Sequence, residues 1–143
     1  MGDVLHALPA VTALRKAHPA WKIDWAIDPR WLALLTAEHE NAALGADRNR
    51  ARPVVDQIYL VPTKDWGRAP FKMQTWREIR ELRRDLRVGL YDAVLDMQGA
   101  IRSSIVARMA GCRRVIGEAA PRESVARWLY SERVETTGQH VIE

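Results

Sequence analysis

Apolar residues follow two different spacings along the chain, and these spacings predict its helices and strands. Near the N-terminus, four apolar residues recur at helical spacing: Val4, Leu8, Val11 and Leu14. Pro19 ends the helix that this spacing predicts, whereas Pro9 either kinks the helix or lies near its start. Residues 22–27 then alternate polar and apolar side chains, which is typical of a strand, and residues 31–35 favour a short helix.

The same two patterns alternate through the rest of the chain. Three more strands are predicted, over residues 57–61, 91–96 and 114–117. Helical spacing predicts helices over residues 75–87, 101–109 and 123–130. The apolar face of the first of these helices is expected to carry Trp76, Ile79, Leu82 and Leu86. The polar stretch 38–53 and residues 62–70 are expected to be loops. Strands that alternate with helices favour a Rossmann-like α/β fold, a parallel sheet with helices on both faces.

The predicted order begins on a helix, although a sheet of this kind normally begins on a strand. Gly2 and Asp3 have the character of a sharp turn between a strand and a helix, yet only Met1 precedes them. We therefore expect the first strand of the domain to be missing. Asp3 is either a simple N-cap of the helix or a carboxylate at the ligand-binding edge of the sheet, and the spacing leaves both open.

The composition is that of an ordinary globular protein, with 48% hydrophobic and 28% charged side chains among 143 residues. No apolar stretch approaches the roughly 20 residues that a membrane span requires. The single Cys112 excludes an internal disulfide and fits a reducing cytoplasm. With one Cys and four scattered His, we expect no metal site.

Positive charge is concentrated in one segment. Residues 64–87 carry eight of the 22 Lys and Arg but four of the 18 Asp and Glu, so the net charge of +4 arises there. Four arginines share one face of the predicted helix: Arg77, Arg80, Arg84 and Arg87. This face is either solvated surface or a contact with an anionic membrane, and the local excess of charge indicates an anionic partner.

Strand-to-helix turns converge at one edge of such a sheet, where ligands bind, and three segments are expected there: residues 2–3, 62–70 and 96–99. In the second segment, Lys64, Trp66 and Arg68 suit an anionic sugar or phosphate, although a solvated loop around one buried Trp fits equally well. In the third, Asp96 and Gln98 are either polar turn residues or ligand contacts, and Gly99 permits a sharp turn before the next helix.

Six short motifs follow one another along the chain. They read MGDVLHALPAV at 1–11, KIDW at 22–25, YDAVLDMQG at 91–99, RSS at 102–104, RE at 122–123 with LY at 129–130, and QHV at 139–141. In this order they resemble the lipopolysaccharide heptosyltransferases of glycosyltransferase family 9, and the type I enzymes more than type II. The resemblance covers almost the whole chain.

The resemblance implies a GT-B fold, two Rossmann-like domains facing across a cleft, and no cofactor. The N-terminal domain would bind the acceptor, Kdo-lipid A, and the C-terminal domain the donor, ADP-heptose. Transfer would invert the anomeric carbon, and Asp3 matches the general base. Five side chains would contact the acceptor: Lys64, Arg68, Gln98, Arg102 and Arg122. Gly2 and Gly99 would shape the turns.

On this basis, residues 1–143 are expected to form one incomplete acceptor-binding domain that is inactive without the missing donor domain. The enzyme would work in the cytoplasm, with peripheral contact to the inner face of the inner membrane as a further hypothesis. Two alternatives stay open: a non-catalytic basic α/β module that binds an anionic polymer or lipid, and a family 9 transferase with another acceptor. No nucleic-acid partner is expected, because no binding motif or row of stacking aromatics is visible.

Overall fold

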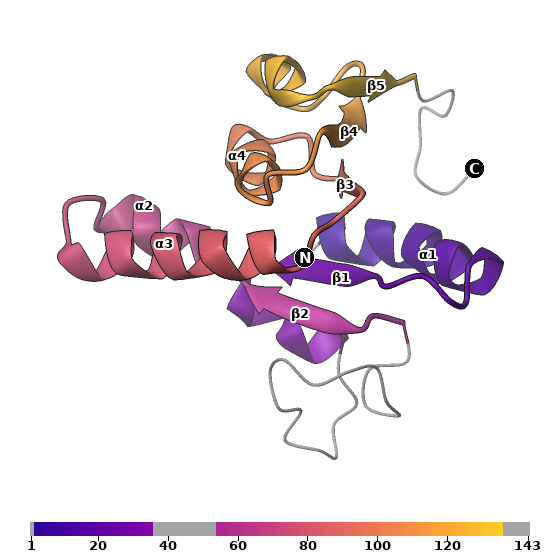
Figure 1. The fold of residues 1–143 in the computed structure, drawn as a ribbon. Helices are drawn as coiled ribbons and strands as arrows, with labels where there is room; N and C mark the ends of the chain where they lie inside the picture. The colour runs from indigo at the N-terminus through magenta and orange to yellow at the C-terminus, as the bar shows by residue number, and fades with distance from the viewer. Residues whose placement is uncertain (1, 36–53, 136–143) are drawn as a thin grey trace. The chain divides into compact units, whose positions relative to one another are not determined.

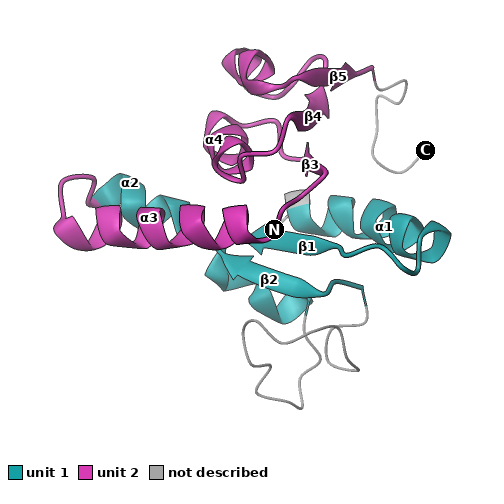
Figure 2. Ribbon diagram, viewed as in Figure 1, with its two compact units in different colours: residues 1–68 teal, residues 69–143 magenta. Residues whose placement is uncertain are grey.

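The computed structural model describes residues 2–35 and 54–135, with the backbone alone at residues 2 and 3. The chain divides into two compact units, residues 1–68 and residues 69–143, which Figure 2 shows in different colours. Each unit is described by itself.

Unit 1 contains a pair of parallel strands with helices before, between and after them. Its elements are α1 (Gly2–Ala17), β1 (Asp24–Ile27), the 3-10 helix η1 (Pro29–Leu34), β2 (Gln57–Leu60) and α2 (Thr63–Arg68). The strands β1 and β2 lie side by side (Figure 1). In their register, Asp24 lies opposite Gln57 and Ile27 opposite Leu60. Pro9 lies inside α1 rather than at its start.

The core of unit 1 confirms three of the four apolar positions predicted near the N-terminus; Leu14 is not among the side chains packed on it. Four buried side chains form its centre: Ile27, Leu35, Val55 and Ile58. Val4, Leu8 and Val11 of α1 pack against this cluster. Burial of this one stripe of α1 is therefore what holds the helix on the β1–β2 pair.

Unit 2 contains a three-stranded parallel sheet and its connecting helices. Its elements are α3 (Met73–Val88), β3 (Ala93–Asp96), α4 (Ile101–Met109), β4 (Arg114–Glu118), the 3-10 helix η2 (Ser124–Leu129) and β5 (Glu132–Val134). The central strand is β4, with Asp96 of β3 opposite Gly117 on one side and Glu132 of β5 opposite Ile116 on the other. The buried cluster of this unit comprises Ala107, Val115, Ala126 and Tyr130.

The parallel direction is confirmed in every described strand pair, and the strands are divided between two sheets. The prediction of a loop over residues 62–70 was wrong, because α2 occupies most of it. Pro62 provides the first carbonyl of this helix, which accepts hydrogen bonds from the backbone N–H groups of Asp65 and Trp66 at 3.0 and 3.1 Å. The short helices at 31–35 and 123–130 are 3-10 helices, and β5 was missed.

The apolar face of α3 is narrower than predicted. Leu82 and Leu86 are buried as expected, and Thr75 lies with them. Trp76 was placed on this face, but its side chain is 53% exposed. At 100° per residue, position 76 lies about 100° around the helix from the buried stripe, next to the arginines. None of the described helices has the length and apolar character needed to cross a membrane.

Candidate functional site

A buried carboxylate lies where β3 ends and the turn into α4 begins. Asp96, the last residue of β3, is 8% exposed and accepts hydrogen bonds through both oxygens. Its Oδ1 accepts from the backbone N–H groups of Gln98 (3.0 Å) and Gly99 (3.3 Å). Its Oδ2 accepts from the hydroxyls of Ser103 (3.0 Å), Ser104 (2.8 Å) and Tyr130 (2.8 Å). Asp96 thus joins the turn, α4 and the end of η2, and we call these residues the Asp96 cluster.

Two of the three hydroxyl-bearing side chains of this cluster are buried away from water. Ser104 is fully buried, and Tyr130 is 4% exposed. The ring of Tyr130 lies against Gly117, where a Cβ would approach the ring carbons to 2.3 Å. Burial, together with the neighbouring Asp96 carboxylate, raises the pKa of Tyr130 to about 12, although the Ser104 hydroxyl opposes the shift. The Tyr130 hydroxyl therefore remains a proton donor at neutral pH.

Residues 122–123 are attached to the turn that follows β3. The backbone N–H of Glu123 donates to the carbonyl of Gly99 at 2.9 Å. In the opposite direction, the backbone N–H of Ile101 donates to Glu123 Oε2 at 2.8 Å, which satisfies a free donor at the start of α4. Gly99 has a φ of +65°, and a Cβ there would lie 3.0 Å from the backbone N of Arg122. Only glycine allows this approach.

Three of the predicted acceptor-binding residues are carried by these joined segments. Gln98 lies on the turn, Arg102 in the first turn of α4, and Arg122 beside Gly99; all three are exposed. They follow the carboxyl end of a parallel strand, which is where ligands bind in open α/β sheets. Their contact with the acceptor stays a prediction.

The other two predicted acceptor contacts lie at the corresponding edge of unit 1. Lys64 and Arg68 are exposed on α2, directly after β2, and Arg68 forms an exposed ion pair with Asp65 at 3.3 Å. Asp28 follows the neighbouring strand β1. Its hydrogen bonds from Arg30 lower the pKa of Asp28, and the charge of Lys64 adds a smaller effect in the same direction. Cations from both turns are thus close together at this edge.

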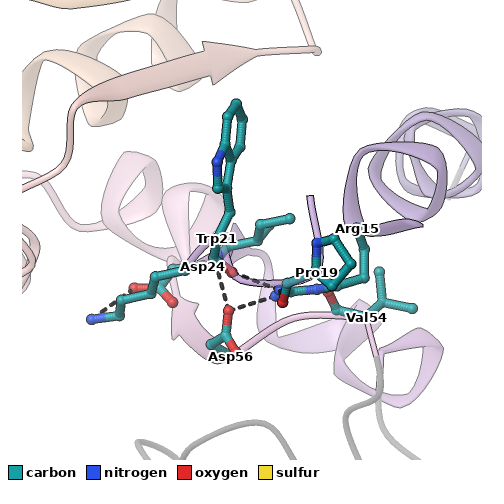
Figure 3. Close-up of polar contacts among 8 residues, drawn as sticks. Arg15, Pro19, Trp21, Asp24, Val54 and Asp56 are labelled. Carbon is teal, nitrogen blue, oxygen red and sulfur yellow. Dashed lines mark hydrogen bonds and ion pairs between the residues drawn. The ribbon is translucent and has the colours of Figure 1, made fainter. Parts of the chain in front are cut away.

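A second buried charge cluster lies at the opposite end of the unit 1 strands (Figure 3). Arg15 of α1 forms an ion pair with Asp56 at 2.5 Å and donates to the carbonyls of Val54 (3.0 Å), Pro19 (3.2 Å) and Trp21 (2.6 Å). Asp56 also accepts from the backbone N–H of Ile23 at 2.7 Å. Because Asp56 directly precedes β2, this cluster holds the amino ends of the strands, away from the ligand-binding edge.

The arginines of α3 form a broad exposed face. Arg77 and Arg84 pair with acidic neighbours, at 4.0 Å to Glu81 and 3.0 Å to Asp85. In the described part of the chain, the side chains of Arg80, Arg83 and Arg87 have no ion pair or hydrogen bond. These three, with Arg84 and Val88, line a shallow surface hollow.

The predicted base, Asp3, is placed only as backbone, in the first turn of α1, which begins at Gly2. Its side chain, and the motif at 139–141, lie outside the described residues. Within the described ranges, no three His, Cys, Asp or Glu side chains come close enough together to hold a metal ion.

Parallel strands whose carboxyl ends run into helices that carry polar side chains define a Rossmann-like α/β protein. Residues 79–143 match the model of glycosyltransferase family 9 (heptosyltransferase). Along its full length the chain is 31% identical to lipopolysaccharide heptosyltransferase 1 of Salmonella typhimurium and 30% identical to that of Escherichia coli. It spans 42% and 41% of these two relatives, about two-fifths of their length.

Solved structures agree with the sequence comparison. E. coli heptosyltransferase WaaC with ADP matches 99% of the chain at a TM-score of 0.76 and 28% identity, over 41% of the WaaC chain. WaaC with ADP-2-deoxy-2-fluoro heptose matches 98% of the chain at a TM-score of 0.77 and 27% identity, again over 41%. The resemblance to the heptosyltransferases of glycosyltransferase family 9 is thereby confirmed, and the fold is consistent with the N-terminal Rossmann-like half of a GT-B enzyme.

Sequence reasoning identified the turn after β3 but missed the residues that support it: Ser103, Ser104, Glu123 and Tyr130. A signal was present, since the RSS, RE and LY motifs contain all four of these residues. These residues all bond to Asp96 or to the turn at Gly99, so the separate motifs share one structural role.

Proposed function

We propose that residues 1–143 are the acceptor-binding part of a heptosyltransferase that acts in lipopolysaccharide inner-core synthesis. The observation that carries this proposal is the match of 99% of the chain to a solved heptosyltransferase, with sequence similarity along its whole length. The donor, ADP-heptose, would be held mainly by a further domain beyond this segment. Such a donor is supported by the ADP and ADP-sugar analogue in the WaaC structures.

In the proposed reaction, Asp3 acts as the general base. It takes the proton from a Kdo hydroxyl as that oxygen attacks the anomeric carbon of the heptose. The new carbon–oxygen bond forms as the bond from the anomeric carbon to the phosphate oxygen breaks, ADP leaves, and the configuration inverts. The position of Asp3 in the first turn of α1 supports this role, because the helix dipole favours an ionised carboxylate there.

The acceptor is anionic, and the exposed cations of both units suit it. Kdo carries a carboxylate, and lipid A carries phosphates. Lys64 and Arg68 on α2, and Arg102 and Arg122 in unit 2, would form charge-assisted hydrogen bonds with such groups. Gln98 would add a neutral contact. Charge-assisted bonds are about twice as strong as neutral ones, so these cations would dominate acceptor affinity.

The experiment is a heptose-transfer assay on a chimera in which residues 1–143 replace the matching segment of E. coli heptosyltransferase 1. The chimera should transfer heptose from ADP-heptose to Kdo-lipid A. Asp3→Asn should lower kcat by at least about 100-fold, the scale of general-base catalysis, while ADP-heptose binding is unchanged. The matched control is Asp92→Asn. Asp92 is exposed and directly precedes β3, at the amino end of that strand. Near-normal turnover of the Asp3 variant would overturn the base assignment.

The basic face of α3 supports a second proposal, peripheral contact with an anionic membrane. Arg80, Arg83 and Arg87 lie on this face, and the half-exposed Trp76 lies beside them. Each cation near an anionic lipid surface contributes about 1 kcal/mol. The chain should therefore co-sediment with phosphatidylglycerol vesicles in low salt and not with phosphatidylcholine vesicles.

A charge-matched pair of variants tests this face. Arg80→Gln with Arg83→Gln should weaken vesicle binding about tenfold or more, because two such contacts are lost. Arg127→Gln with Arg133→Gln removes the same charge from η2 and β5, outside α3, and should bind normally. Equal losses in the two double variants would show only a net-charge effect. Vesicle binding by a chimera that transfers no heptose would favour the non-catalytic binding module instead.

A further inference from the structure

The Asp96 cluster holds a buried carboxylate without a cation. Among the described residues no Lys, Arg or His pairs with Asp96, and its five donors are all neutral. Removing a carboxylate from water costs several kcal/mol, so an apolar side chain would join these strands at lower cost. We therefore expect the buried Asp96 carboxylate to have a role other than holding α4 on the sheet.

The hydrogen-bond pattern indicates that reason. One oxygen of Asp96 binds the two consecutive N–H groups of the turn, which fixes the backbone direction at Gln98. The other oxygen is held by α4 and by Tyr130, which is 34 residues away in sequence. The carboxylate therefore fixes the turn relative to the sheet and α4.

The proton donors of the cluster are not equivalent. Ser103 and Ser104 can each donate either to Asp96 or to the carbonyl of Ala100, which lies 2.8 Å from both hydroxyls. The Tyr130 hydroxyl has no backbone carbonyl among its described partners, and it is nearer to Asp96 (2.8 Å) than to Ser104 (3.1 Å). Each hydroxyl has one proton, so Tyr130 is the donor most committed to the carboxylate.

The same turn determines where Arg122 lies. Two hydrogen bonds, one between backbone groups and one from a backbone N–H to the Glu123 carboxylate, tie Glu123 to residues 99–101. The close approach of Gly99 to Arg122 leaves little room between them. A change in the turn therefore moves Gln98 and Arg122 together.

We propose that Asp96, Ser104 and Tyr130 are positioning residues that hold Gln98 and Arg122 in the geometry that binds the anionic acceptor. This inference rests on the proposed function and extends it, because it assigns the buried cluster a role in acceptor affinity rather than in stability alone. None of the three residues touches the acceptor; they act through the turn.

The test is steady-state kinetics on the active chimera with Tyr130→Phe, which removes the hydroxyl and keeps the ring on Gly117. We expect KM for Kdo-lipid A to rise about tenfold, the scale of one hydrogen bond to a charged group, with kcat and KM for ADP-heptose unchanged. Ser104→Ala should shift the same parameter by less, because Tyr130 and Ser103 still donate to Asp96.

Ser131→Ala is the matched structural control. The Ser131 hydroxyl accepts from the N–H of Val115 at 2.8 Å and donates to its carbonyl at 3.2 Å, near the amino end of β4. Its loss should lower the melting temperature without changing KM for the acceptor. The positioning role is overturned if Tyr130→Phe leaves acceptor KM as Ser131→Ala does, or lowers kcat and both affinities alike. An unsubstituted chimera that transfers no heptose would overturn the proposed function itself, and the positioning role with it.

Discussion

The two units each bury one aspartate in a hydrogen-bonded cluster, and the two clusters differ in charge and in place. Asp56 of unit 1 is neutralised by Arg15 at 2.5 Å. Among the residues that the structure describes, Asp96 of unit 2 has neutral donors only, three hydroxyls and two backbone N–H groups. Asp56 directly precedes β2, whereas Asp96 is the last residue of β3.

We expect this difference to separate a cluster that only stabilises its unit from one that also positions acceptor-binding residues. The amino ends of parallel strands lie away from bound ligands, so the Arg15–Asp56 pair can be optimised for stability alone. The carboxyl ends carry the ligand-binding turns, and there a carboxylate that accepts backbone N–H groups can fix a turn. We expect substitutions in the first cluster to change stability and those in the second to change acceptor affinity as well.

The largest effect on stability is expected from Arg15→Ala. Arg15 is 8% exposed, and its removal leaves Asp56 partly buried and without its cation while three carbonyls lose a donor. Breaking such a pair costs about 3–5 kcal/mol in the free energy of unfolding, measured by urea titration. Lys16→Ala, at an exposed neighbouring position, is the control. A loss no greater than that of the control would show that the cluster does not stabilise unit 1.

Asp96→Asn should destabilise the protein somewhat less than Arg15→Ala does, but it should weaken acceptor binding more. The amide keeps the size of the carboxylate but turns an NH2 group towards other donors, so at least one partner loses its bond, at about 1–3 kcal/mol. In the chimera the same change should raise KM for the acceptor by more than Tyr130→Phe does. Unchanged acceptor affinity in a folded Asp96→Asn enzyme would make the two clusters equivalent.

Gly99→Ala should produce an intermediate loss. Its φ of +65° is strained for alanine, and the new Cβ would lie 3.0 Å from the backbone N of Arg122. The backbone strain alone costs about 1–2 kcal/mol. Gly111→Ala is the matched control, since Gly111 has a φ of +76° but its nearest neighbours are side-chain atoms of Arg87. Only Gly99→Ala should weaken acceptor binding; equal binding by both variants would contradict a role for the turn.

The smallest expected effect is a change in the pH dependence of the free energy of unfolding at alkaline pH, which within the Asp96 cluster depends on Tyr130 alone. Its pKa is raised in the folded state, from 10.0 to about 12, so the folded protein keeps a proton that the unfolded chain releases. This contribution to stability is complete below pH 10 and is lost as the pH rises from 10 towards 12. Urea titrations should show that loss in the unsubstituted chain and a smaller loss in Tyr130→Phe. The same pH dependence of stability in both proteins would show that Tyr130 is not the group whose pKa is raised.

The sequence predicted most of the fold because apolar periodicity reports burial. The stripe of α1 and four of the five strands followed from it. The fifth, β5, was missed because its residues Glu132, Arg133 and Val134 are all exposed, so no apolar pattern marks it. The prediction put Trp76 on the buried face of α3 because an aromatic residue close to the helical spacing of Ile79, Leu82 and Leu86 has the pattern of a core residue.

The candidate site was predictable in part for a similar reason. Strand order placed residues 96–99 after the carboxyl end of a strand, and Gln98 lies there and is exposed. That Gln98 and Arg122 bind the acceptor stays a prediction. The support beneath them was not predictable, because the hydrogen bond from Tyr130 to Asp96 joins positions 34 residues apart and depends on the register of three strands. Local spacing contains no information on such a contact.

The most direct test of the account is heptose transfer by the chimera of residues 1–143 with the remaining part of E. coli heptosyltransferase 1. We predict transfer of heptose from ADP-heptose to Kdo-lipid A that requires Asp3 and whose acceptor KM rises in Tyr130→Phe. A folded chimera that binds ADP-heptose and transfers no heptose to Kdo-lipid A would contradict it.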